Sequence, residues 1–175
     1  IKKGLNTVQI AYDYYKTCGL EAVYLLGSFG VRLEDGRKKP VLTTLPEKLR
    51  AGDITDQGLP FYSGRVRYFL PSALEGRYKV RLSGTNAACI KVAGTQEAMI
   101  VQAPYEAETE QMKALELVLC RRNTFGPLHQ WPAKDMAYGP GNFVTAGKAW
   151  RDSYVLQKQG ILRKPVIWRE KPDVM

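Results

Sequence analysis

Residues 64–84, GRVRYFLPSALEGRYKVRLSG, decide the fold class of this chain. Apolar and charged side chains alternate on both sides of a central segment that contains Pro71 and Gly76. A period of two residues is that of a β-strand with one buried face, and proline and glycine interrupt such strands. The stretch therefore predicts two antiparallel strands, with Val66 and Val80 on the buried face.

Similar short runs continue on both sides of this stretch. Residues 88–105 predict another hairpin around Gly94, and residues 7–14 alternate like a single strand. Two closing strands are expected within 154–162 and 165–171. Many short alternating runs separated by turn residues indicate an all-β fold, and specifically an antiparallel β-sandwich.

Residues 106–122, EAETEQMKALELVLCRR, carry two conflicting patterns. The segment is rich in strong helix formers, and Met112, Leu115 and Leu119 match a helical stripe. It also alternates in the manner of a strand. Because pairing and burial often override local propensity, and strands are expected on both sides, we predict a strand over about 114–120.

The size and cysteine content of the chain limit its class. With 175 residues, 45% of them hydrophobic, it is long enough to bury one core. We expect an end strand of a preceding module, or a strand completing this one, in 1–20, and the main domain in 21–175. Cys18, Cys89 and Cys120 lack metal-site spacing and are expected to be buried free thiols. Reduced thiols slightly favour the cytoplasm, but the localisation stays unknown because the chain begins at an isoleucine.

The net charge is +9, and residues 111–175 carry 11 basic against 5 acidic side chains. Such a bias attracts phosphates or anionic polysaccharides, and a solvated surface explains it equally well. The longest basic run has three residues, at 37–39, which argues against nucleic acid as a partner. No apolar run reaches the roughly 20 residues that span a bilayer, so no membrane contact is expected.

The sequence contains no recognisable catalytic motif. His129, the single histidine, could act as a base, but no serine or cysteine lies in a recognised nucleophile motif. Acidic pairs for glycoside hydrolysis need a cleft geometry that a sequence does not show; the candidates are Asp53, Asp56, Glu106, Glu108 and Asp135. Phosphate-binding loops and metal clusters are missing. We therefore predict no catalytic residue, no metal site and no cofactor in this chain.

A long loop over about 129–152 is rich in glycine, proline and aromatic residues. Flat aromatic rings stack on the C–H faces of sugars, and neighbouring arginine, asparagine and histidine side chains bind hydroxyls. The alternative is that these aromatic rings fill the open end of the sandwich, since large aromatic side chains are mostly buried.

Three segments together resemble a known family: QGLPFYSGRVRYFLP (57–71), YKVRLSGTNAACIKVAGTQEAMIVQAPYEAE (78–108) and RRNTFGPLH (121–129). They are similar to the C-terminal β-sandwich of bacterial glycoside hydrolases, the large enzymes with a family-2-type sugar-binding domain and the α-L-rhamnosidase-like proteins. That sandwich is a jelly roll of the galactose-binding-domain-like type. In this family the catalytic carboxylates reside in a separate barrel domain.

The resemblance implies a non-catalytic, carbohydrate-associated accessory domain of a larger glycoside hydrolase. Its partners would be a weakly bound carbohydrate and the other domains of the parent enzyme. The predicted ligand-binding residues are Trp131, Trp150 and Tyr138 as stacking surfaces, with His129, Asn123 and Arg122 as hydrogen-bonding neighbours. The alternative is a purely structural domain that braces the parent enzyme and uses its exposed aromatic residues as an interface.

Overall fold

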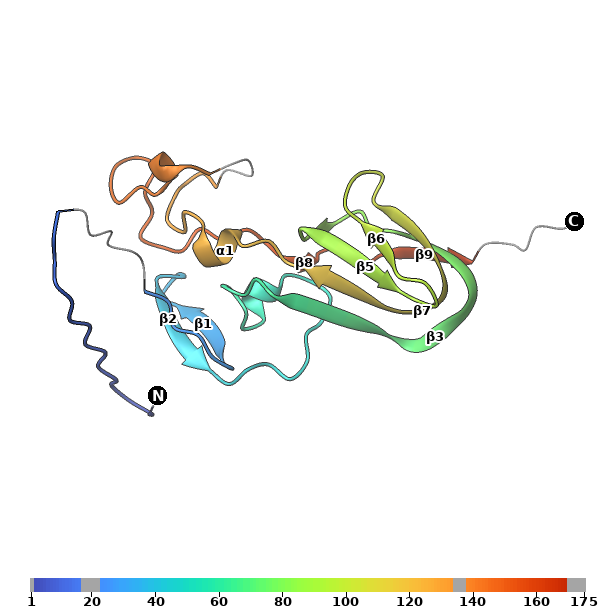
Figure 1. The fold of residues 1–175 in the computed structure, drawn as a ribbon, viewed down its shortest axis with the longest axis horizontal. Coiled ribbons are helices and arrows are strands. Elements are labelled where there is room, and N and C mark those ends of the chain that lie inside the picture. The colour runs from blue at the N-terminus through green and yellow to red at the C-terminus, as the bar shows by residue number, and fades with distance from the viewer. Residues whose placement is uncertain (1, 17–22, 134–137, 170–175) are drawn as a thin grey trace, which may run out of the picture.

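The computed structural model describes residues 2–16, 23–133 and 138–169 of the chain (Figure 1). The regular secondary structure of the described part is mainly antiparallel strands, which confirms the all-β prediction. In chain order the elements are β1 (Gly30–Glu34), β2 (Lys39–Thr43), η1 (Ile54–Asp56), β3 (Arg65–Arg81), β4 (Thr85–Asn86), β5 (Cys89–Ala93), β6 (Ala98–Ile100), β7 (Glu106–Val118), α1 (Arg122–Phe125), η2 (Pro140–Asn142), β8 (Gly160–Ile161) and β9 (Val166–Arg169).

One sheet dominates the structure. Its five strands lie in the order β6-β5-β7-β3-β9, and every neighbouring pair is antiparallel. Figure 1 shows this sheet as a curled layer, with the β1–β2 hairpin and the long loop after α1 at the end of the molecule far from β9. The strands β4 and β8 form a further two-stranded pair.

The prediction of two strands within residues 64–84 is wrong, because the structure has a single strand, β3, over the whole length. β3 pairs with β7 on both sides of its central segment. The register shifts between Phe69 and Leu74 and again between Leu74 and Arg77, and Gly76 has a φ of +101°. The turn residues therefore produce a bend with irregular pairing instead of a reversal. The alternation itself is confirmed, since Val66 and Val80 are buried.

The strand predicted over 114–120 is confirmed and is longer, since β7 covers Glu106–Val118. It lies in the centre of the sheet, between β5 and β3. Over Ala114–Val118 both edges of its backbone are paired with neighbouring strands. This explains why pairing prevails over the helical propensity of its glutamates, leucines and alanines. The predicted hairpin around Gly94 is also confirmed, as β5 and β6.

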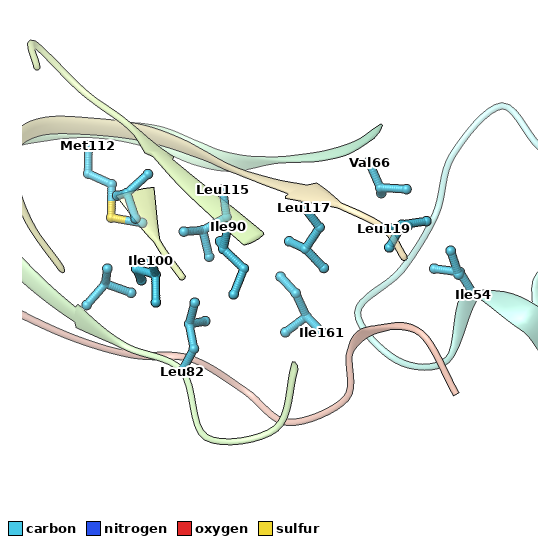
Figure 2. Packing of buried hydrophobic residues seen from close by; sticks show 12 residues of the cluster. Ile54, Val66, Leu82, Ile90, Ile100, Met112, Leu115, Leu117, Leu119 and Ile161 are labelled. Atoms are coloured by element: carbon cyan, nitrogen blue, oxygen red, sulfur yellow. The ribbon is translucent and has the colours of Figure 1, made fainter. Parts of the chain in front are cut away.

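The core lies on one face of the five-stranded sheet (Figure 2). It combines residues of β3, β5, β6 and β7 with Ile54 of η1 and Ile161 of β8. Leu117 and Val92 are completely buried. Side chains from η1 and β8 thus cover a face that the sheet alone would leave in contact with water.

The opposite face of the sheet is charged. Glu116 of β7 is aligned with Arg67 of β3 and with Lys91 of β5. Its carboxylate accepts a hydrogen bond of 2.9 Å from Nε of Arg67, and its side chain is only 8% exposed. Glu106 and Glu108, two of the acids considered for catalysis, both pair with Lys79. On this face the acids thus serve cross-strand pairing.

The N-terminal strand predicted at 7–14 is wrong for this structure, because no ladder forms within the described residues 2–16. Apolar and polar residues alternate here, but no strand among the described residues pairs with them, and Val8 and Tyr14 remain 78% and 72% exposed. A strand needs a neighbour to bind its backbone groups, which sequence alternation does not supply. The assignment of 1–20 to a module boundary stays a prediction.

The two closing strands differ in outcome. The segment 165–171 contains β9, as predicted, whereas 154–162 contains only the two residues of β8. Cys89 and Cys120 are free thiols, as expected, but are only partly buried, and Cys18 lies outside the described residues. None of the described helices is long and apolar enough to cross a membrane.

Candidate functional site

The long loop folds back on itself through backbone hydrogen bonds. Trp131 N donates to Ala149 O at 2.7 Å, and Arg151 N donates to His129 O at 2.8 Å. Gln130 and Trp150 also form an isolated antiparallel bridge. The first and last parts of the loop therefore lie side by side, and residues about twenty positions apart in the sequence become neighbours.

This folding back produces a shallow cavity of about 330 Å³, which we call the loop hollow. Its wall includes Trp131 and Arg151 from the loop, Ser153 and Tyr154 directly after it, and Arg37 from the turn between β1 and β2. Trp131 is 51% exposed, so a large part of its surface is open to a ligand. Of the six predicted ligand-binding residues, Trp131 is the one that lies in this wall.

His129 and Trp150 pack beside the hollow as part of an aromatic cluster. The ring centroids of His129 and Trp150 are 6.3 Å apart with an interplanar angle of 24°, and Tyr154 lies 4.9 Å from His129. Nδ1 of His129 is 2.9 Å from the carbonyl oxygen of Arg151. Because a carbonyl only accepts, Nδ1 must carry the proton and donate. In the structure, His129 and Trp150 thus hold the two parts of the loop together.

Asn123 is fully buried at the start of the loop. Its Nδ2 donates to Gln157 O at 2.7 Å, and its Oδ1 accepts from Gln157 N at 2.9 Å. The amide side chain therefore replaces a strand neighbour for the backbone of residue 157. This contact fixes the path of the chain after β7.

Arg122 is also buried, and only 5% of it is exposed. Its Nη2 donates to Pro127 O at 2.9 Å, and its guanidinium lies over the ring of Tyr138, 5.0 Å from the centroid. This cation–π contact covers one face of the Tyr138 ring, which the sequence analysis predicted to stack on a sugar. Asn123, Arg122 and Tyr138 thus anchor the loop in this structure, while Trp131 presents its ring at the surface.

The turn that carries Arg37 is tied to the loop by charge as well as by packing. Lys38 Nζ lies 3.1 Å from a carboxylate oxygen of Asp152. The hydrogen bond to Asp152, and then its negative charge, raise the pKa of Lys38 above the ordinary value. Tyr154 N further donates to Arg37 O at 2.9 Å. The wall of the hollow is therefore assembled from the β1–β2 turn and from a loop far from it in the sequence.

The sequence pattern did not predict that Arg37, Arg151, Ser153 and Tyr154 would share the wall of one cavity. Arg37 was noted only as part of a basic run, and nothing in the pattern around it indicates a contact with the loop. The shared position becomes visible only when the loop doubles back. Among the residues that the structure describes, no cluster of histidine, cysteine or carboxylate side chains is suited to hold a metal ion.

Comparisons with known proteins add no family assignment. No family model matches the chain, and neither the curated proteins nor the solved structures contain a match to it.

Proposed function

We propose that this chain is a non-catalytic, carbohydrate-associated domain of a larger glycoside hydrolase, of the jelly-roll, galactose-binding-like type, and that it binds glycan at the loop hollow. The observation that carries this proposal is the position of Trp131. Its ring is half exposed in a shallow cavity whose wall also contains two arginines. The resemblance of the strand and loop motifs to such accessory domains supports the class of ligand.

The chemistry of the hollow suits a sugar. An exposed indole offers a flat apolar face to ring C–H groups, while guanidinium and hydroxyl groups of Arg151 and Ser153 donate to sugar oxygens. The wall is also held in place before a ligand arrives, by the backbone bonds between 129–131 and 149–151. Preorganisation of this kind lowers the entropy cost of binding.

A bracing role within the parent enzyme is the second candidate, and a different surface favours it. Val23 and Leu26 are 75% and 84% exposed, and Tyr24 packs edge-on against Phe125 with centroids 5.0 Å apart. Phe125 itself is 45% exposed. Adjacent exposed apolar side chains of this size typically mark a protein interface.

The substitution Trp131→Ala tests the glycan proposal. Phe69→Ala is the matched control, because Phe69 is an exposed aromatic residue of β3, 74% exposed. Retardation in affinity gels containing soluble polysaccharides, preceded by a glycan array, measures binding. We expect Trp131→Ala to weaken binding about 30-fold, the equivalent of about 2 kcal/mol for an aromatic hot spot, and the control to bind normally. Equal retardation of both variants would refute the platform.

The bracing role makes a separate prediction. The folded chain would bind no glycan, and adding the remaining domains of the parent enzyme would raise its melting temperature, because a partner that binds only the folded state stabilises it.

A further inference from the structure

Arg37 occupies an unusual backbone position between β1 and β2. Asp35, Gly36 and Arg37 have φ values of +47°, +60° and +68°. A long side chain in the left-handed region is uncommon and is strained, so surrounding contacts must hold it there. Two such contacts are present: Arg37 O accepts from Tyr154 N at 2.9 Å, and Arg37 Nη2 pairs with Asp56 Oδ1 of η1 at 2.6 Å. The turn thus fixes one guanidinium between η1 and the loop.

A second and larger cavity, of about 440 Å³, also has Arg37 in its wall, and we call it the hairpin hollow. Arg37 contributes to the walls of both hollows, so the two adjoin at this side chain. The hairpin hollow combines apolar surface from Val31 and Leu33 with the hydroxyls of Thr43 and Thr44. Small apolar faces beside a few polar groups are the lining expected of a ligand site.

The charges of the two hollows differ. In the hairpin hollow, Arg37 is paired with Asp56, and Arg32 is paired with Glu34 at 2.6 Å. In the loop hollow, Arg151 donates from Nη1 to the carbonyls of residues 148 and 150, and it forms no salt bridge within the described part of the chain. One guanidinium without a salt bridge among the described residues, that of Arg151, therefore lies in the wall beside Trp131, while both arginines of the hairpin hollow are paired with carboxylates.

We propose that the two hollows form one groove for a linear anionic oligosaccharide. A sugar that carries an acidic group would lie on Trp131 with its anion at Arg151, and the following sugars would continue past Arg37 into the hairpin hollow. This inference rests on the proposed function and adds the class of ligand, an extended and acidic chain. The basic excess of residues 111–175, with 11 basic and 5 acidic side chains, favours the approach of such a ligand.

The test measures affinity as a function of ligand length and charge by calorimetry with the whole chain. The probes are oligogalacturonides from monomer to hexamer, cello-oligosaccharides of the same lengths, and a sulfated hexasaccharide. We expect affinity to rise about tenfold or more from dimer to hexamer, to favour the acidic probes, and to fall with salt. The uronate and sulfate arms distinguish the two kinds of anion.

Thr44→Trp would fill the hairpin hollow and remove the gain from dimer to hexamer, while binding of the dimer stays unchanged. Thr7→Trp is the matched control, because Thr7 is exposed in the N-terminal segment. If Thr44→Trp lowers the melting temperature, Arg32→Ala serves as a second variant, because the Arg32 side chain is 64% exposed. Its removal leaves the negative charge of Glu34 unpaired beside the acidic ligand. Both variants are expected to weaken only the longer probes.

The outcomes separate this inference from the proposed function. Binding that does not depend on length, and that Thr44→Trp leaves intact, overturns the groove while the glycan site remains. Equal affinity for neutral and acidic hexamers overturns the charge preference. Failure of every probe and of the glycan array to bind the folded chain overturns both proposals and favours bracing.

Discussion

Replacing Asn123 by alanine should destabilise the protein more than its single side chain suggests. Asn123 is fully buried and forms two hydrogen bonds with the backbone of Gln157, one as donor and one as acceptor, at 2.7 and 2.9 Å. Alanine removes both bonds at once. The amide and carbonyl of residue 157, which is partly buried, then each lose this partner.

The expected loss follows from these contacts. A buried polar group that loses its partner costs about 1–3 kcal/mol, so two such groups give a loss of about 3 kcal/mol in the free energy of unfolding. For a chain of this length, each kcal/mol corresponds to about 2–4 °C in melting temperature. We therefore expect Asn123→Ala to melt about 6–12 °C below the unaltered protein.

Urea denaturation followed by circular dichroism, with a thermal scan beside it, measures this loss. Asn6→Ala is a closely matched control, because Asn6 also donates to and accepts from the backbone of Lys2, at 2.8 Å in each direction, and donates to Gly4 O at 2.9 Å, but is exposed. We expect the control to change stability by less than about 0.5 kcal/mol. A loss for Asn123→Ala no larger than that of Asn6→Ala would refute the argument.

Leu117→Ala should lower the free energy of unfolding by about 2–5 kcal/mol, because Leu117 is completely buried in the central strand. Leu42→Ala, at a site 42% exposed, should lower it far less. Equal losses of the two variants in urea denaturation would contradict the assigned core. The stability difference between the unaltered protein and Glu106→Gln should depend on pH, because hydrogen bonds from Arg81 and then Lys79 lower the pKa of Glu106. A carboxylate whose pKa is lower in the folded than in the unfolded protein stabilises the fold at a pH above its unfolded-state pKa of about 4.3. This stabilisation is lost as the pH falls through the folded-state pKa. Denaturation series from pH 6 to pH 3 should show the difference shrinking, and a constant difference would count against the ion pairs.

Local pattern predicted the elements whose partners are near in the sequence. The β5–β6 hairpin around Gly94 needs only a short turn and alternation, and both are visible in the sequence. The strand β7 required a further argument, since its helix formers were outweighed only because β3 and β5 flank it. Long-range pairing, and not intrinsic preference, decides such a segment.

The same reasoning explains the failures. Pro71 and Gly76 looked like a turn, but β7 pairs with β3 on both sides of them and converts the turn into a bend. Residues 7–14 alternate as β-strands do, yet within the described structure no neighbour completes a ladder beside them. A periodic pattern states which face a strand would bury, and it does not state whether a partner strand is present.

For the candidate site, the sequence determined which residue types are available, and the tertiary structure decided how each is used. Aromatic residues in a Gly- and Pro-rich segment indicated a long loop, and Trp131 is exposed in its described part. The burial of Asn123 and Arg122, however, follows from contacts with residues 157 and 127, and the place of Arg37 follows from its bond to Tyr154.

The alternation of apolar and polar residues is enough to predict antiparallel strands with one apolar and one polar face, because a period of two is a local property of the backbone. Three features became visible only in the folded chain: β3 runs as one bent strand through Pro71 and Gly76, two hollows share Arg37, and Trp131 lies in the wall of the loop hollow. These features depend on contacts between residues far apart in the chain, whose free energies no local pattern encodes.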